Sequence, residues 1–320
     1  MVFQFIPAGT APLMARLTRS LNGTEAMAVL DLEDGCRDPF DPARTIVCKV
    51  EGRHRLIEMC PIAEKQTTRQ PVAMRLNAPG TAEFERDLPI AQRVTEVFEL
   101  AIVLLPKITA PEDLSTAHQT LHQAGIRFGG LVPMIETVKG MNHLAPIIAT
   151  AKQLGAPAIL YGYHDYCLDA GYWPFLDLEE KAYWEIVEHI ARPTLAAGLR
   201  YIHPPQVDLH DRTRLGELIA GLHRLCGEKF DILSAGMSQT TILRELLNHP
   251  APPISPLPHW RESPVLDVAE KRRLAREICD LFAAKNRAEH SFAADARKGR
   301  FISPHEYFAA KRYLQGGEGA

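Results

Sequence analysis

The chain alternates short apolar runs with amphipathic segments, and this alternation limits the possible folds more than any other feature of the sequence. Short apolar runs flanked by Gly or Pro are typical of buried strands, and the longer segments between them have the apolar spacing of helices. The alternation occurs eight times over about 235 residues, which is the order and size of a (β/α)8 TIM barrel. A doubly wound sheet would also alternate, but it would need a Gly-rich phosphate-binding turn that the sequence lacks. We therefore predict an α/β barrel over residues 1–248, with strands at 2–6, 26–32, 71–77, 101–105, 131–135, 158–161, 199–202 and 230–235.

The sequence changes character after the predicted barrel. Six prolines fall between His249 and Pro264, so residues 249–264 are predicted to form an extended linker. Asp267 followed by Glu270 resembles a helix start, and residues 265–320 are predicted to be a C-terminal helical extension. An amphipathic helix outside a closed barrel packs either on the barrel wall or on a neighbouring subunit. We expect a subunit interface there, and hence a homo-oligomer.

Composition excludes several classes of protein. With 46% apolar residues among 320, the chain can bury a sizeable core. The formal charge of −3 predicts no binding to nucleic acid or to a membrane, and no apolar stretch is long enough to span a bilayer. The six cysteines are widely spaced and form no C-x-x-C pair, so they indicate neither a zinc site nor a disulfide framework. Reduced thiols predict a cytoplasmic protein.

Two of the predicted strands are followed by an acidic residue. The run from Leu131 to Ile135 stops at Glu136, and the run that begins at Ala158 is followed by Asp165. A buried carboxylate is costly unless it is paired or bound to a metal, and carboxylate oxygens are the ligands that Mg²⁺ or Mn²⁺ prefers. We therefore predict a divalent metal between Glu136 and Asp165. The alternative is that each acid simply caps the helix that follows it.

Further charged residues lie at the ends of other predicted strands. Glu33 and Asp34 follow the second strand, Arg75 lies near the end of the third, and Lys107 follows the fourth. Active sites of such barrels lie at the carboxyl ends of the strands, so these side chains are expected to meet the two acids at one mouth. A lysine there could form a Schiff base with a carbonyl substrate, although most lysines are simply exposed.

Six short motifs give the chain a resemblance to a known family. In chain order they are FIPAG from Phe5, LDLEDG from Leu30, RLN from Arg75, PK from Pro106, IET from Ile135 and GYHD from Gly162. Together, over residues 1–245, they resemble the citrate lyase β-subunit and malyl-CoA lyase family. That family belongs to the HpcH/HpaI-type aldolase superfamily of barrels, which use pyruvate or phosphoenolpyruvate-like substrates.

The resemblance implies three kinds of site residue. These are metal ligands (Glu136, Asp165), catalytic residues (Arg75, Glu33, Asp34) and substrate contacts (Arg75, Lys107, Gly162). The arginine would bind an oxyanion or carboxylate of the substrate, and the two catalytic acids would hold metal-bound waters or the arginine. Cleaving a C–C bond beside a carbonyl leaves an enolate, whose charge a metal and a forked guanidinium can stabilise.

Two features depart from the family pattern. The Ile-His-Pro-x-Gln motif of the family belongs after the eighth strand, whereas its match here, from Ile202 to Gln206, follows the seventh. His203 is still expected at the barrel mouth, as a substrate contact or a general base. In relatives a C-terminal hairpin can lend an acid to a neighbour's site. Both of its acids are missing from residues 298–305, where Ser303 takes the place of the second, so the use of CoA stays open.

Three functions are compatible with these observations. The first is a Mg²⁺-dependent carbon–carbon lyase, similar to citrate lyase β, that cleaves or forms a β-hydroxy acid or its CoA thioester. The second is a CoA-independent class II aldolase acting on a 2-oxo acid such as pyruvate. The third is a barrel kept as a binding or scaffold protein. The set of charged residues counts against the third, because unpaired buried charges destabilise by about 3 to 5 kcal/mol.

Overall fold

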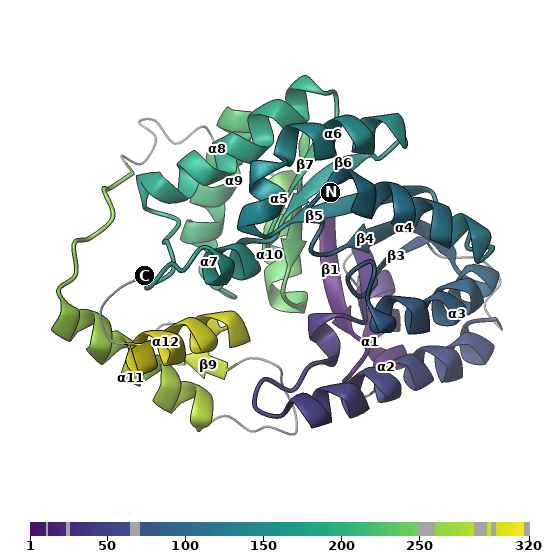
Figure 1. Ribbon diagram of the computed structural model, residues 1–320, viewed down its shortest axis with the longest axis horizontal. Helices are drawn as coiled ribbons and strands as arrows, with labels where there is room; N and C mark the ends of the chain where they lie inside the picture. Colours follow the sequence, from purple (N-terminus) through teal and green to yellow (C-terminus); the bar gives the residue numbers. More distant parts are fainter. Residues whose placement is uncertain are drawn as a thin grey trace.

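The computed structural model describes residues 1–10, 12–23, 26–64, 71–248, 260–284, 293–295 and 299–316. Within them, eight parallel strands close into a barrel in chain order, which confirms the predicted (β/α)8 fold (Figure 1). The strands are β1 (Val2–Pro7), β2 (Met27–Asp31), β3 (Pro71–Arg75), β4 (Glu99–Leu105), β5 (Gly130–Ile135), β6 (Ala158–Tyr161), β7 (Arg200–His203) and β8 (Phe230–Ser234).

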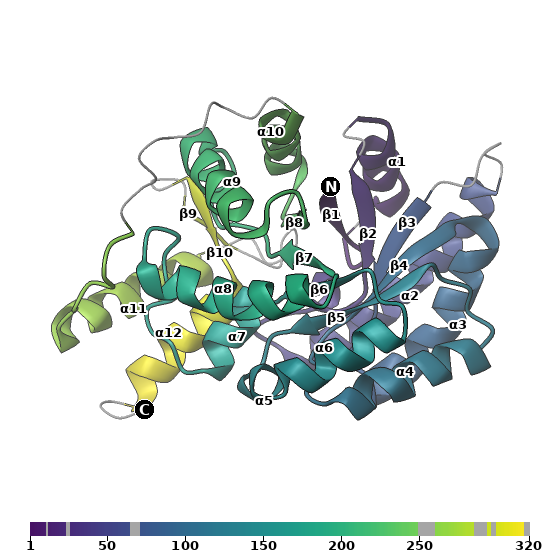
Figure 2. The same cartoon turned by 90° about the horizontal axis from the view of Figure 1, so that it is seen from above.

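Helices surround the barrel, with at least one between each pair of successive strands (Figure 2). A short 3-10 helix, η1 (Asp34–Cys36), directly follows β2. The α-helices of the barrel are α1 (Leu13–Gly23), α2 (Pro42–Ala63), α3 (Ala82–Val97), α4 (Pro111–Gln123), α5 (Val138–Asn142), α6 (Leu144–Gln153), α7 (Tyr163–Asp169), α8 (Lys181–Ala196), α9 (Arg212–Cys226) and α10 (Met237–Asn248).

The core has an inner and an outer layer. Strand β6 shows how they form, because successive side chains point to opposite faces of a strand. Ala158 and Leu160 lie in the cluster inside the barrel, whereas Ile159 and Tyr161 lie in the larger cluster between strands and helices. Apolar packing thus fills the barrel, so polar chemistry is confined to the strand ends.

The connection between β5 and β6 contains two helices. These are α5 and α6, which are separated at His143. Pro146 explains the break, because a proline has no N–H to donate and its ring would clash with the carbonyl of Asn142. Helix α7, which carries Asp165, was not predicted at all.

Three polar residues near helix starts do not act as N-caps. Asp177 does not cap α8, which begins at Lys181; its carboxylate binds Arg214, at 2.8 Å. The Thr109 hydroxyl donates to Asp113 at 2.8 Å, and the N-cap of α4 is Ala110. Ser238 lies inside α10, which begins at Met237.

The C-terminal extension packs on the barrel of its own chain. It consists of α11 (Val268–Ala283), a hairpin of β9 (Ala293–Asp295) and β10 (Arg300–Ile302), and α12 (Pro304–Gly316). Phe282 and Tyr307 stack at 4.6 Å, and both rings contact Phe40 of the barrel at 5.4 Å. Helix α12 also lies against α7 (Figure 2). A subunit interface at the extension stays a prediction, and linker residues 249–259 lie outside the described part of the chain.

Two exclusions made from the sequence can be compared with the structure. No helix among the described residues is long and apolar enough to cross a membrane. All six cysteines are free thiols, as their spacing indicated.

Candidate active site at the barrel mouth

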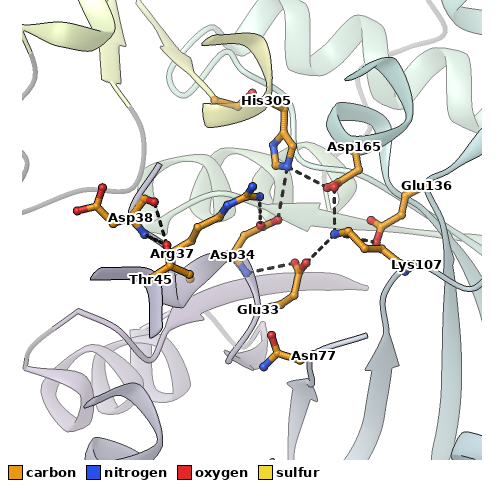
Figure 3. Close-up of polar contacts among 12 residues, drawn as sticks. Glu33, Asp34, Arg37, Asp38, Thr45, Asn77, Lys107, Glu136, Asp165 and His305 are labelled. Carbon is orange, nitrogen blue, oxygen red and sulfur yellow. Dashed lines mark hydrogen bonds and ion pairs between the residues drawn. The ribbon is translucent and has the colours of Figure 1, made fainter. Parts of the chain in front are cut away.

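The charged residues singled out in the sequence meet at the carboxyl ends of β2 to β6, and Figure 3 shows most of them facing one another. The closed parallel barrel causes this, because it places every strand's carboxyl end on one rim. Around that rim lie Glu33 and Asp34 after β2, Arg75 at the end of β3, Lys107 after β4, Glu136 after β5 and Asp165 in the first turn of α7.

Arg75 is a buried cation held by a fork of two hydrogen bonds. Its Nε and Nη2 each donate to a carboxylate oxygen of Asp31, both at 2.7 Å. The remaining nitrogen, Nη1, lies 3.1 Å from Glu33 and 3.5 Å from Asp34. The guanidinium also lies over the ring of Phe5, 4.5 Å from its centroid. Asp31 therefore binds two of the three nitrogens of Arg75, and the third faces the carboxylates of Glu33 and Asp34.

Lys107 occupies the centre of the acidic group. Its ammonium lies 2.7 Å from Glu33, 3.1 Å from Asp165 and 3.9 Å from Glu136. Burial would lower the pKa of Lys107, but the facing carboxylates, Glu33 first among them, raise it well above its ordinary value. The amine is therefore protonated at neutral pH and is not a nucleophile, which argues against a Schiff base.

Glu136 is buried against backbone. Its Oε1 accepts a hydrogen bond from the backbone N–H of Lys107 at 2.8 Å. Gly162 packs so closely that a Cβ there would lie 2.2 Å from Glu136 Oε2, so only glycine fits. Burial, and then the charge of Asp165, raise the pKa of Glu136 well above its ordinary value. Glu136 does not cap a helix, since the N-cap of α5 is Thr137, and the capping alternative fails for this residue.

Asp165 faces two cations from different parts of the chain. One carboxylate oxygen lies 3.1 Å from Lys107, and the other lies 3.2 Å from Nε2 of His305. Burial would raise the pKa of Asp165, but His305 and then Lys107 hold it below its ordinary value. Asp34 completes this cluster, with an oxygen 4.0 Å from the same Nε2.

His305 was not identified from the sequence. It lies at the start of α12, in the extension, and its side chain is buried. Residues 298–305 had been compared with a family hairpin for the acids they lack, and a histidine two positions after Ser303 gave no separate signal. The structure shows that this segment reaches the mouth of its own barrel. Ser303 itself caps α12, because its hydroxyl accepts from the backbone N–H of Glu306 at 3.1 Å.

A cavity of about 160 Å³ lies beside these residues. Barrel residues, among them Arg75, Glu136, Gly162 and Asp165, form one wall, while the other is formed by Phe301 and residues 303–305 of the extension. The extension thus forms one side of the cavity at the barrel mouth. Neither Lys107 nor its nearest partner Glu33 lines this cavity, whereas its other partners, Glu136 and Asp165, do.

His203 is not part of the cavity wall, contrary to the expectation from sequence. It ends β7 and is fully buried, with Nε2 2.8 Å from the Tyr183 hydroxyl and Nδ1 3.2 Å from the Tyr201 hydroxyl. Gln206 approaches the same Nε2 at 3.2 Å. Burial lowers the pKa of His203 to about 3, so the ring is neutral. Its partners make it a structural residue, because both nitrogens are already satisfied.

The arrangement fits a divalent cation. The carboxylates of Asp31, Glu33, Asp34, Glu136 and Asp165 gather here around a few cations, and burial and then the charge of Asp165 raise the pKa of Glu136. Buried like charges repel, and a bound cation would relieve that repulsion. Ligand atoms of Asp34, Asp165 and His305 lie within 4.8 Å of one another, which is close enough to share one ion after small rotations.

No protein-family model matches the sequence, and no curated protein sequence matches it. Solved structures do match. The malate synthase of Haloferax volcanii, solved as a pyruvate/acetyl-CoA ternary complex, has a TM-score of 0.67 at 19% identity, over 98% of this chain and 92% of its own. The citrate lyase beta subunit of M. tuberculosis, solved with oxaloacetate and magnesium, has a TM-score of 0.55 at 19% identity. The match covers 76% of this chain and 95% of that subunit.

RipC of Yersinia pestis is a third neighbour, with a TM-score of 0.54 at 18% identity, over 79% of this chain and 96% of its own. Identities this low establish the fold alone. The malate synthase match extends over nearly the whole chain, so it includes the C-terminal extension as well as the barrel. The chain therefore has the barrel fold of the citrate lyase beta subunit and malate synthase structures, which confirms the fold that its motifs implied.

Proposed function

We propose that this protein is a carbon–carbon lyase that depends on a divalent metal. It would cleave or form a β-hydroxy acid or its CoA thioester by a retro-aldol or retro-Claisen step, through an enolate. The observation that carries the proposal is the meeting of Glu136 and Asp165 with Lys107 and Arg75 beside a cavity at the barrel mouth. The neighbouring folds support it, because one is a citrate lyase beta subunit bound to oxaloacetate and magnesium.

Glu136 and Asp165 are proposed to hold Mg²⁺ or Mn²⁺. Such an ion supplies Lewis-acid stabilisation of the negative charge that develops on an enolate oxygen. Glu33 orients the site by binding both cations, since its two oxygens lie 2.7 Å from Lys107 and 3.1 Å from Arg75. Gly162 leaves the space into which the Glu136 carboxylate fits.

Arg75 is proposed to bind the substrate carboxylate or oxyanion through Nη1, the nitrogen that Asp31 leaves free. Asp31 fixes the guanidinium plane, so the cation is already in position before substrate arrives. A preorganised donor of this kind loses little energy to reorientation during the reaction. Lys107 is proposed to keep the carboxylates in place electrostatically, close to the substrate but not in covalent contact with it.

A second candidate is a CoA-independent aldolase acting on a 2-oxo acid such as pyruvate. The size of the cavity favours it, because cavities of about 150 Å³ accommodate a molecule of benzene size, and the space here is about 160 Å³. A small carboxylic acid fits such a space. The neighbouring malate synthase structure contains both pyruvate and acetyl-CoA, so it supports a small acid with or without a CoA partner.

The decisive experiment is a calorimetric titration of Mg²⁺ and Mn²⁺ into the wild type and a Glu136→Ala/Asp165→Ala variant, with and without oxalate, an enolate mimic. We expect metal binding in the wild type and its loss in the variant, with oxalate binding only when metal is present. Glu51→Ala/Glu58→Ala is the matched control, because both acids are exposed on α2 and should leave binding unchanged.

A substrate screen follows the titration. It compares β-hydroxy acids, their CoA thioesters, and pyruvate with aldehydes, and it measures the 2-oxo acid or CoA released or consumed. Turnover of a thioester but not of the free acid would select the first candidate over the second. A wild type that binds neither metal would refute the lyase and leave the scaffold hypothesis in its place.

A further inference from the structure

His305 is placed as a metal ligand would be, although no motif in the sequence pointed to it. Its side chain is 95% buried, and its Nε2 forms no hydrogen bond of normal geometry. The same nitrogen nevertheless points at two carboxylates, Asp165 and Asp34 (Figure 3). A buried nitrogen that lacks a hydrogen bond normally calls for an explanation, such as a missing ion or water.

The distances are compatible with a shared ion. Neighbouring donors in an octahedral site with bonds of about 2.1 Å lie about 3 Å apart. Nε2 of His305 and Oδ2 of Asp165 are already 3.2 Å apart. Asp34 Oδ2 lies 4.0 Å from Nε2, so a small rotation of that side chain would complete the set.

We propose that His305 and Asp34 are further ligands of the divalent ion assigned above to Glu136 and Asp165, so that the C-terminal extension of the same chain completes the metal centre. The inference rests on the proposed function, since the same ion would serve the reaction. An all-oxygen site suits Mg²⁺, whereas an imidazole ligand suits Co²⁺ and Zn²⁺ better. The site should therefore prefer Co²⁺ or Zn²⁺ to Mg²⁺, by a margin that depends on His305.

The first test is pulsed EPR of the Mn²⁺-loaded protein, which detects a directly bound imidazole nitrogen. One precaution is needed, because His118 and His122 form an exposed pair on α4 with Nε2 atoms 3.1 Å apart, a surface arrangement that can bind metals adventitiously. All measurements therefore use a His118→Ala background. We expect a nitrogen coupling that disappears in His305→Ala and persists in the control His54→Ala, whose histidine is exposed on α2.

The second test is calorimetric competition between Co²⁺ and Mg²⁺. His305→Ala and His305→Gln should each lose Co²⁺ affinity by roughly 10- to 100-fold, the scale seen when metal-site partners are removed. Mg²⁺ affinity should change by less than about threefold, since water can replace the nitrogen on an ion that keeps several waters. The ratio of the two affinities thus reports the ligand and is independent of activity.

The outcomes separate this inference from the proposed function. Metal binding without nitrogen coupling in the wild type would overturn the role of His305 and leave the lyase proposal standing. A coupling that persists in both His305 variants would also overturn it, because another histidine would then be the ligand. If the variants do not fold, the spectrum of the His118→Ala background still tests the inference, because the absence of a nitrogen coupling would overturn it and its presence would support it. Failure of the wild type to bind any divalent ion would remove both proposals.

Discussion

Two buried histidines, His305 and His203, occupy opposite environments. His305 lies at the acidic mouth, where burial would lower its pKa but Asp165 raises it above its ordinary value. His203 lies in the aromatic cluster between β7 and α8, where the hydroxyls of Tyr183 and Tyr201 satisfy both ring nitrogens and burial lowers its pKa to about 3. Burial alone therefore does not identify a functional histidine. The two residues differ in their partners, because both ring nitrogens of His203 are satisfied, whereas Nε2 of His305 forms no hydrogen bond of normal geometry.

The surroundings of the two histidines, the acidic mouth and the aromatic cluster, also differ in how they are stabilised. The acidic mouth concentrates carboxylates that repel one another, and the cations among them offset that repulsion. The aromatic cluster pairs neutral donors with neutral acceptors, an arrangement that stabilises the fold without any ligand. Substitutions in the first region should alter ligand binding, and substitutions in the second should alter stability alone.

The largest expected effect is that of Arg75→Met at the mouth. Asp31 would remain buried without its cation, and breaking such a pair costs about 3–5 kcal/mol. Urea unfolding should show this loss of stability. Arg93→Met is the control, because Arg93 pairs with Glu64 and Glu96 at the surface, where ion pairs contribute about 1 kcal/mol or less. Equal losses of stability in the two variants would show that the ion pairs of Arg75 at the mouth contribute no more than those of Arg93 at the surface.

A smaller effect is expected of Gly162→Ala. The new Cβ would lie 2.2 Å from Oε2 of Glu136, so that carboxylate must move. Overpacking of this kind costs about 1–3 kcal/mol, and metal affinity should fall by roughly tenfold or more. Thermal melting and calorimetry measure the two effects. Gly216→Ala in α9 is the control, since nothing lies within 4 Å of its added Cβ, and it should stabilise by up to about 1 kcal/mol.

In the aromatic cluster, Tyr183→Phe should lower stability but leave metal affinity nearly unchanged. The hydroxyl that is lost bonds both to His203, at 2.8 Å, and to Gln206, at 2.7 Å. Stability should fall by about 1–2 kcal/mol, because buried polar groups lose a partner. Metal affinity should stay within twofold of wild type by calorimetry. A larger loss of affinity would mean that the two regions are coupled.

A further expected effect is a pH dependence of stability from His203. Its pKa in the folded protein, about 3, lies below that of an unfolded histidine, so the unfolded chain binds the proton more readily. The stability that this histidine contributes is full above a pH of about 6.5 and is lost as pH falls toward 3, by up to about 1.4 kcal/mol per pH unit. Urea unfolding between pH 7 and pH 4 should show a shallower slope for His203→Gln. An unchanged slope would mean that His203 is not buried in neutral form.

Much of the site could be predicted from sequence because strand ends are local features. Glu33, Asp34, Arg75, Lys107, Glu136 and Asp165 each follow or end an apolar run, and all of them lie at the mouth. His203 also ends a strand, yet it lies outside the cavity wall. A position at the end of a strand predicts that a residue lies at the rim. It does not predict which way the side chain points or which residues it contacts.

The sequence by itself determined the barrel and the chemical character of its mouth. Eight alternations of strand and helix leave few topologies, and a closed parallel barrel brings every carboxyl strand end to one rim. Only the tertiary structure decided that Asp31 takes two of the three nitrogens of Arg75, and that α12 carries His305 to Asp165. Both contacts join residues that are distant in the sequence, and the second depends on how Phe282 and Tyr307 pack against Phe40, which no local pattern encodes.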